Sequence, residues 1–254
     1  MDTVLMILAV SLSMKEDERR IITREMIRGF NETATRAHTQ VTGGQTVMNP
    51  WPIIGGVGMT VATESEFIRP VGAEVGDVLV LTKPLGTQIA VNLYEWFHDK
   101  RQLFDKLNGE VSAEEVHRIY EAACQSMSAL NRTAASLMRK YGAKAATDVT
   151  GFGLIGHARN LASVQTAAVA FSIHTLPAIR GVPVIDKRIY DFKLREGLSA
   201  ETSGGLLIAL ARDQAEAFVK ELTEREGKWG WVIGEVMAGE RTAQISPEAE
   251  FLEV

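Results

Sequence analysis

One acid stands alone in a segment where its position could matter for chemistry. The stretch AATDVTGFGLIGHARNLA, residues 145–162, places Asp148 between a short strand and the glycines that turn the chain into a helix. The first turn of a helix carries free N–H groups and positive partial charge, so anions gather there. Asp148 could stabilise that helix without any ligand. It could also hold Mg²⁺, which prefers oxygen ligands and often bridges a carboxylate to phosphates. The spacing alone leaves both interpretations open.

A second segment that could bind an anion is VTGGQTV, residues 41–47. The adjacent glycines Gly43 and Gly44 permit positive φ angles and a close approach between ligand and backbone. Successive N–H groups there, up to Gln45, could form an anion-binding nest, and Thr46 would add a hydroxyl. An ordinary hairpin turn or bulge explains the same residues. The segment is not a Walker motif, because no Lys-Ser or Lys-Thr pair follows at the P-loop spacing.

Three further features point to structure more than to chemistry. The segment ETSGGLLIA, residues 201–209, resembles an anion loop but also an ordinary strand entrance, and we favour the structural interpretation. His157 lies a turn or two into its helix, where packing against the sheet is the simpler role. Cys124, the single cysteine, falls among apolar helical residues, so we expect a buried thiol and no nucleophile.

Strands and helices must position these residues, and the hydrophobic pattern predicts both. Ser13 with Glu16, and Ser112 with Glu115, have capping-box spacing, which predicts that helices begin there. The pattern predicts strands at 3–12, 52–63, 78–82, 144–149, 167–173, 206–210, 230–237 and 241–246. It also predicts helices after residue 13, at 87–97, at 112–140, up to 163 and at 212–226. This mixture indicates an α/β or α+β fold with a boundary near residue 75.

Composition excludes several classes of protein. The chain has 254 residues, 46% of them hydrophobic, which is enough to bury a core in one large or two ordinary domains. Its net charge of −5 argues against a nucleic-acid surface, and one cysteine excludes a disulfide framework. No apolar run approaches the roughly 18 residues of a membrane span. We therefore expect a soluble, cytoplasmic protein that binds neither nucleic acid nor membranes.

Five blocks of the sequence together resemble a known family. VTGGQTVMNPWPIIGG, GDVLVLTKPLGTQIA, LNRTAASLM, AATDVTGFGLIGHARNLA and ETSGGLLIAL occur in this order, and they closely resemble selenophosphate synthetase over nearly the whole chain. The resemblance implies a two-domain α/β (α+β) fold shared with aminoimidazole ribonucleotide (AIR) synthetase. It also implies an enzyme that converts ATP, selenide and water into selenophosphate, phosphate and AMP for selenocysteine synthesis.

The resemblance assigns roles to particular residues. Asp148 matches an acid that binds Mg²⁺ in the family. The residues that match the ATP-binding loop are Gly43, Gly44, Gln45 and Thr46. Residues 1–75 would be the remainder of the N-terminal ATP-binding domain, and residues 76–254 the C-terminal domain. The family forms a homodimer through a β-barrel, to which strands 3–12 and 52–63 would belong.

The sequence also departs from the family. The catalytic Cys or selenocysteine, the catalytic Lys and the other Mg²⁺-binding aspartates would all lie before Met1, and no equivalent remains. We therefore expect an N-terminally truncated form with an incomplete N-terminal domain, no catalytic residue of its own and no activity by itself. Two alternatives stay open: a catalytically silent paralogue with a binding or regulatory role, and another ATP-dependent enzyme of the superfamily.

Overall fold

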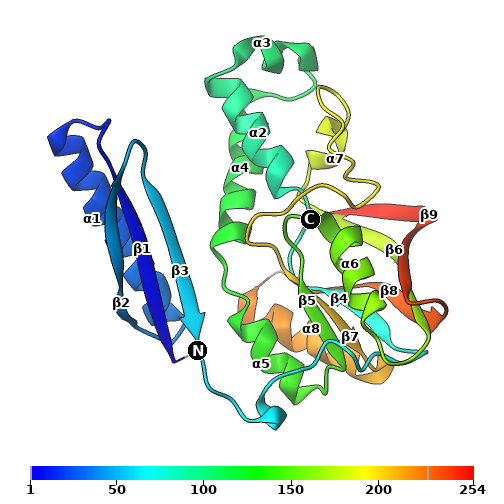
Figure 1. The fold of residues 1–254 in the computed structure, drawn as a ribbon. Coiled ribbons are helices and arrows are strands. Elements are labelled where there is room, and N and C mark those ends of the chain that lie inside the picture. The colour runs from blue at the N-terminus through cyan, green and yellow to red at the C-terminus, as the bar shows by residue number, and fades with distance from the viewer. Residues whose placement is uncertain (1, 228) are drawn as a thin grey trace. The chain divides into compact units, whose positions relative to one another are not determined.

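The computed structural model of this chain describes residues 2–227 and 229–254. The chain divides into two compact units, unit 1 at residues 1–67 and unit 2 at residues 68–254 (Figure 1). Unit 1 contains a three-stranded sheet and unit 2 a six-stranded sheet. Across the described residues, every helix is too short or too polar to cross a membrane.

Unit 1 is a small sheet with one long helix packed on it. Strand β1 (Thr3–Ser11) lies between β2 (Val41–Asn49), which runs parallel to it, and β3 (Ile53–Met59), which runs antiparallel. Helix α1 (Glu16–Arg36) connects β1 to β2, and a 3₁₀ turn, η1 (Glu64–Glu66), follows β3.

Helix α1 covers one face of this sheet. The Phe30 ring of α1 occupies the space where a Cβ on Gly56 would lie, at 2.8 Å. Val4 and Leu8 are buried, whereas Leu5 and Ile7 are exposed. Successive side chains of a strand point to opposite faces, so the second face of the sheet is left uncovered within the unit.

The predicted start of α1 is wrong by two residues, because the N-cap is Lys15 and not Ser13. The helix begins at Glu16, and Ser13 lies outside it because its N–H donates to Ser11 Oγ at 3.2 Å. The acid that returns to the start of the helix is Glu18, whose Oε2 accepts from the N–H of Lys15 at 3.3 Å. The strand predicted at 3–12 is confirmed as β1.

Unit 2 is built on a mixed sheet whose strands lie in the order β5-β7-β4-β8-β6-β9. All neighbouring strands are antiparallel except β6 and β9, which are parallel. The strands are β4 (Val78–Leu81), β5 (Ala145–Asp148), β6 (Val169–Ala178), β7 (Leu206–Leu210), β8 (Trp231–Ala238) and β9 (Thr242–Glu253).

Helices cover both faces of this sheet. The side chains of β4 alternate between two cores: Leu79 and Leu81 belong to the larger core, and Val78 and Val80 to the smaller one. On the larger side lie α2 (Thr87–His98), α4 (Ala113–Ser128) and α6 (Gly153–Ser163), and on the smaller side α5 (Arg132–Lys140) and α8 (Arg212–Glu226). Short helices α3 (Arg101–Phe104), η2 (Asp105–Leu107) and α7 (Val182–Ile185) complete the unit.

One predicted helix is interrupted. The pattern predicts a single helix over 112–140, but the structure has α4 and α5 with a break at 129–131. Ala129 is extended, with ψ 133°, and its carbonyl accepts a hydrogen bond from Lys83 Nζ instead of continuing the helix. The predicted cap is confirmed, because Ser112 Oγ accepts from the N–H of Glu115 at 3.2 Å.

Candidate active site

Four sequence motifs meet at one end of the sheet of unit 2. The last residue of β5 is Asp148, and the turn after it packs against residues 201–205, which lead into β7. The N–H of Val149 donates to the oxygen of Gly205 at 2.9 Å, and the N–H of Glu201 donates to the oxygen of Thr150 at 3.0 Å. Asn131, from the break between α4 and α5, donates through Nδ2 to the oxygen of Gly204 at 2.9 Å.

The two glycines of the ETSGG segment are required by this close packing. A Cβ on Gly204 would lie 2.0 Å from the oxygen of Val149, and one on Gly205 would lie 2.5 Å from the N of Lys83. Both contacts are with backbone atoms, which cannot rotate out of the way. The paired glycines therefore let the ends of β4 and β5 approach the start of β7.

Asp148 is an exposed carboxylate on the edge strand β5. Its side chain is 57% exposed. Oδ2 accepts from the hydroxyl of Thr150 at 3.0 Å and Oδ1 from that of Thr147 at 3.3 Å. These bonds fix the orientation of the carboxylate but leave it open to solvent, with acceptor capacity unused.

His157 supports the turn that follows Asp148. Its side chain is 9% exposed, and Nε2 accepts from the N–H groups of Thr150 at 3.0 Å and Phe152 at 3.4 Å. An acceptor nitrogen carries no proton, so the hydrogen bonds assign the proton to Nδ1, which lies 3.9 Å from Asp148 Oδ1. We expected His157 to pack against the sheet, but its hydrogen bonds hold its own turn instead.

Glu201 also has a structural role. It is buried, and its two oxygens accept from the N–H groups of Gly86 at 2.7 Å and Thr87 at 2.9 Å, at the start of α2. Burial raises the pKa of Glu201 to about 7, although these hydrogen bonds oppose the shift. The structural interpretation of the ETSGG segment agrees with this geometry. Sequence reasoning missed the contact of Glu201 with the start of α2, because the two lie 114 residues apart along the chain.

The nest predicted in the VTGGQTV segment is not formed, because these residues belong to strand β2. Gly43 pairs with Leu5 of β1 and Gly44 with Met6. In an extended strand successive N–H groups point in opposite directions, whereas a nest needs them on one side. The residues from Gly43 to Thr46 are exposed, and β2 is an edge strand with one unpaired backbone edge. A Cβ on Gly44 would lie 1.8 Å from the oxygen of Met6.

The part of the chain that the structure describes contains no ready-made metal centre. Within residues 2–227 and 229–254, no group of three or more His, Cys, Asp or Glu side chains is placed to hold a metal ion. Asp148 fits Mg²⁺ as one anchoring oxygen ligand, because it is exposed and has free lone pairs. The remaining ligands would have to come from elsewhere, such as substrate phosphates and water.

Two other features carry no catalytic arrangement. Cys124 is half-buried, not buried as predicted, and it shares a hydrogen bond with Tyr120 within α4.

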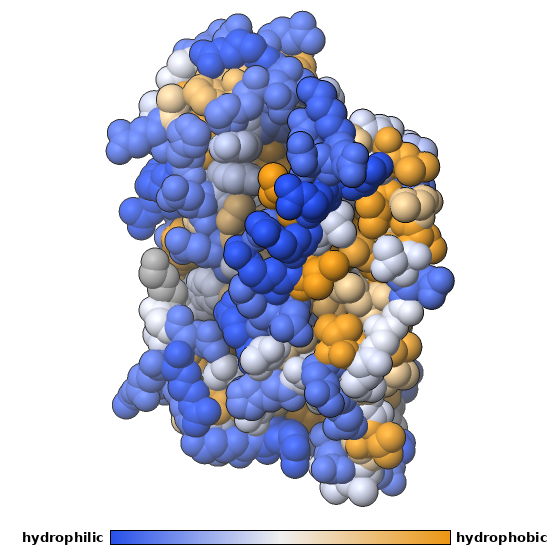
Figure 2. Space-filling view, turned by 90° about the vertical axis from the view of Figure 1, so that its left-hand side faces the viewer, coloured by the Kyte–Doolittle hydropathy of each residue, from blue (hydrophilic) through white to orange (hydrophobic). Residues whose placement is uncertain are grey.

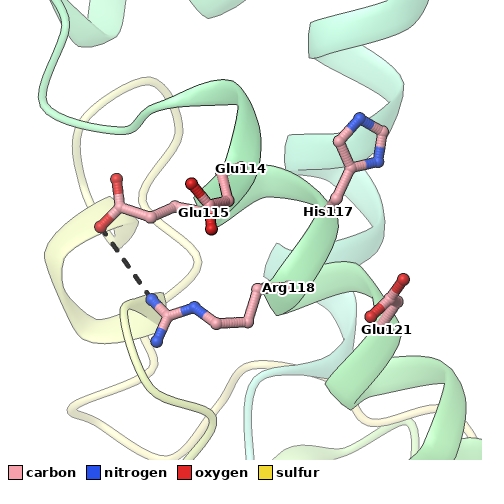
Figure 3. Close-up of a pocket in the computed structure, with 5 residues that line it drawn as sticks. All are labelled: Glu114, Glu115, His117, Arg118 and Glu121. Atoms are coloured by element: carbon pink, nitrogen blue, oxygen red, sulfur yellow. Dashed lines mark ion pairs between the residues drawn. The ribbon is translucent and has the colours of Figure 1, made fainter.

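The outer face of α4 also carries an open hollow with charged walls, where Glu115 and Arg118 lie 4.0 Å apart (Figure 3). Glu115 already caps α4 through Ser112, and none of the five sequence motifs reaches this hollow. Its other lining residues are Glu114, His117 and Glu121.

Comparison with known proteins adds a family and several relatives. Residues 74–245 match the family model described as AIR synthase related protein, C-terminal domain. The chain is 49% identical over 245 residues to a protein of Trypanosoma brucei brucei named selenide, water dikinase, covering 95% of this chain and 62% of that one. It is 50% identical over 256 residues to human selenide, water dikinase 2, covering 100% of this chain and 57% of the human protein. The chain thus spans less than two thirds of these relatives.

Solved structures share the fold at low sequence identity. The crystal structure of E. coli HypE matches with a TM-score of 0.72 at 20% identity, covering 100% of this chain and 72% of HypE. The hydrogenase maturation protein HypE in complex with ATP matches with a TM-score of 0.63 at 17% identity, covering 93% and 65%. At this identity the likeness establishes the fold alone.

Proposed function

This chain belongs to the AIR synthase related family, and on that premise we propose that its protein makes selenophosphate from ATP, selenide and water, releasing AMP and phosphate. The observation that carries the proposal is the identity of 49% and 50% with two proteins named selenide, water dikinase, over 95% and 100% of this chain. The fold by itself does not choose this reaction, because HypE shares it. Four of the five motifs that carry the resemblance lie in unit 2, and these four converge around Asp148.

The proposal gives unit 1 a part in binding ATP. Residues 1–75 would belong to the ATP-binding domain and residues 76–254 to the C-terminal domain. Gly43, Gly44, Gln45 and Thr46 would contact the nucleotide from β2 (these four residues are exposed, and Thr46 offers a hydroxyl). Support comes from the ATP complex of a HypE protein with this fold. The unpaired edge of β2 offers single N–H donors to a phosphate, not a closed nest.

Asp148 would anchor Mg²⁺ in the same reaction. A bound Mg²⁺ neutralises the charge of the transferring phosphoryl groups. The residues of this chain contribute orientation: the Thr150 hydroxyl donates to Asp148 Oδ2, and His157 holds the N–H groups of the turn. These contacts would hold the carboxylate in one orientation before substrate binds, which lowers the entropic cost of ordering it during the reaction.

We also propose a homodimer, formed on the uncovered face of the sheet of unit 1. Its exposed apolar residues are Leu5, Ile7, Val47, Ile53, Val57 and Met59. Figure 2 shows hydrophobic residues gathered along one margin of the surface, beside hydrophilic residues. A second copy would remove this surface from water, and a two-fold pairing closes at two chains. The resemblance implies a β-barrel across this interface.

The direct test is an assay on the full-length enzyme that contains this chain. ATP, Mg²⁺ and selenide are supplied under anaerobic conditions, and AMP and phosphate are measured with and without selenide. We expect AMP formation that depends on selenide. Release of ADP instead of AMP, or a rate that is the same without selenide, would assign the protein to another ATP-dependent reaction of the superfamily.

A further inference from the structure

Lys83 is a buried cation to which neither the sequence motifs nor the proposed function assigns a role. It is the second residue after β4, and it is 2% exposed. Its Nζ donates to the oxygens of Ala129 at 2.7 Å and Ser203 at 2.8 Å. Within the described ranges, no carboxylate lies at ion-pair distance from this ammonium, and the acid that acts on it from α8 is the more distant Glu226.

An unpaired ammonium in this position is costly to keep. Burial lowers the pKa of Lys83 to about 8, which measures how strongly the surroundings disfavour its charge. An apolar side chain of similar length would avoid that cost. The two carbonyls that Lys83 binds belong to irregular backbone, since Ala129 ends α4 and Ser203 has a φ of 50°. Lys83 thus satisfies acceptors that neither the helix nor the sheet can reach.

Each of the two carbonyls lies two residues before a residue that supports the turn after Asp148. Two residues after Ala129, Asn131 Nδ2 holds the oxygen of Gly204. Two residues after Ser203, the oxygen of Gly205 accepts from the N–H of Val149. The ammonium therefore fixes two segments, 129–131 and 203–205, that together hold the turn.

We propose that Lys83 is a positioning residue: by tying the break between α4 and α5 to the ETSGG segment, it fixes the turn that carries the Asp148 carboxylate. Any catalytic consequence rests on the proposed function, but the positioning itself does not. The hydrogen bonds of Lys83 go to the oxygens of Ala129 and Ser203 and not to the carboxylate. Its effect passes through backbone hydrogen bonds to Val149 and Thr150.

The positioning can be tested on the 254-residue chain without any assay of activity. Lys83→Met keeps the length of the side chain and removes its charge and donors, and backbone amide resonances are recorded by ¹H–¹⁵N NMR. We expect the resonances of Val149 and Thr150 to shift along with those of Ser203 and Gly204. The matched control Lys140→Met breaks the ion pair with Glu221 and should shift resonances of α5 and α8 only.

The NMR result decides the inference by itself. Val149 and Thr150 resonances that stay at their wild-type positions in a folded Lys83→Met chain overturn it. If that variant does not fold, Lys83→Gln, which keeps an N–H donor but is shorter and neutral, is examined in the same way. The same two resonances must then move, and their constancy overturns the inference equally.

The catalytic consequence is measured in the full-length enzyme. We expect Lys83→Met to lower kcat at least tenfold, and to raise the Mg²⁺ concentration for half-maximal rate at least threefold. Loss of folded enzyme alone would lower the rate without moving that concentration, and Lys140→Met should leave it unchanged. An unchanged Mg²⁺ requirement in Lys83→Met overturns the catalytic part. Absence of selenide-dependent AMP in the wild-type enzyme refutes the proposed function instead, and the NMR result still stands.

Discussion

His157 and Thr150 are joined through one ring nitrogen: Nε2 of His157 accepts from the backbone N–H of Thr150 at 3.0 Å, across seven residues. This contact closes the turn after β5 onto the first turns of α6. It also directs the protonated Nδ1 toward Asp148. The Asp148 carboxylate itself is held by the hydroxyls of Thr147 and Thr150, so His157 supports it indirectly, through the turn.

Replacing that imidazole should destabilise unit 2. His157→Ala leaves the N–H of Thr150 without its acceptor, and an unsatisfied polar group in a mostly buried position costs about 1–3 kcal/mol. Urea unfolding of the chain measures the loss. His174→Ala is the matched control, because His174 is exposed and should change the free energy of unfolding by less than about 0.5 kcal/mol. Equal effects of the two substitutions would contradict the role given to His157.

The charge of Asp148 should be needed for catalysis but not for folding. Asp148→Asn keeps the size and polarity of the side chain and removes the charge that attracts Mg²⁺. We expect selenide-dependent AMP formation by the full-length enzyme to fall at least about a hundredfold, the usual scale for losing one charge-stabilising group. Asp99→Asn, at the end of α2, serves as the control and should keep its rate. Near-normal turnover of Asp148→Asn at limiting Mg²⁺ would leave Asp148 a purely structural residue.

A methyl group at Gly204 should not be tolerated. Its Cβ would lie 2.0 Å from the oxygen of Val149, and relief requires the start of β7 to move away from β5. We expect Gly204→Ala to lower the free energy of unfolding by about 3 kcal/mol or more. Gly151→Ala is the comparison, since no atom lies within 4 Å of the added Cβ. Thermal unfolding should show a large decrease for the first variant and almost none for the second.

Glu201 should make unit 2 less stable as the pH rises. Its folded pKa is about 7, above the ordinary 4.5, so the folded state binds more protons than the unfolded state between these values. The stabilising contribution is therefore complete below pH 4.5 and is lost as the pH rises through 7. Unfolding midpoints at pH 5 and pH 8 should fall less in Glu201→Gln than in the wild type. A parallel fall in both proteins would show that Glu201 does not titrate in this range.

The proposed homodimer predicts a particle of twice 27.8 kDa for the chain. A lysine at Val57 would place a charge on the uncovered sheet face of unit 1, where burial against a second copy would leave it unpaired. We expect sedimentation velocity to show a dimer for the wild type and a monomer for Val57→Lys. Val61→Lys, at a position 95% exposed and outside β3, should stay dimeric. A wild-type chain that sediments as a monomer would exclude the interface.

Local pattern predicted some elements of unit 2 well, but β6 and β9 end at Ala178 and Glu253, beyond the predicted 173 and 246. β7 and α8 begin and end at the predicted residues, because each has an uninterrupted apolar period bounded by polar residues. β2 was missed, since Gly43 and Gly44 indicate a turn and only pairing with β1 makes them extended. The break after α4 was missed for a similar reason. It depends on Lys83, which lies 46 residues away along the chain.

The candidate site was predicted in part. The position of Asp148 between a strand and a helix follows from the sequence, because strand and helix periods flank it. The supports given by Glu201 and Asn131 are contacts with backbone atoms 114 and 73 residues away along the chain. No spacing rule along one chain encodes such contacts, so they required the folded structure.

The position of β4 in the sheet also constrains how the protein is made. Val80 of β4 pairs with Ile208 of β7 on one side and with Val232 of β8 on the other. Both β7 and β8 come much later in the chain than β4. The ribosome therefore releases the apolar strand VLVL long before the strands that pair with it have been synthesised. Contacts between such distant residues slow folding and leave aggregation-prone surface exposed in the meantime. Unit 2 should consequently fold only after nearly the whole chain has been synthesised, and a nascent chain that stops before β7 should depend on chaperones.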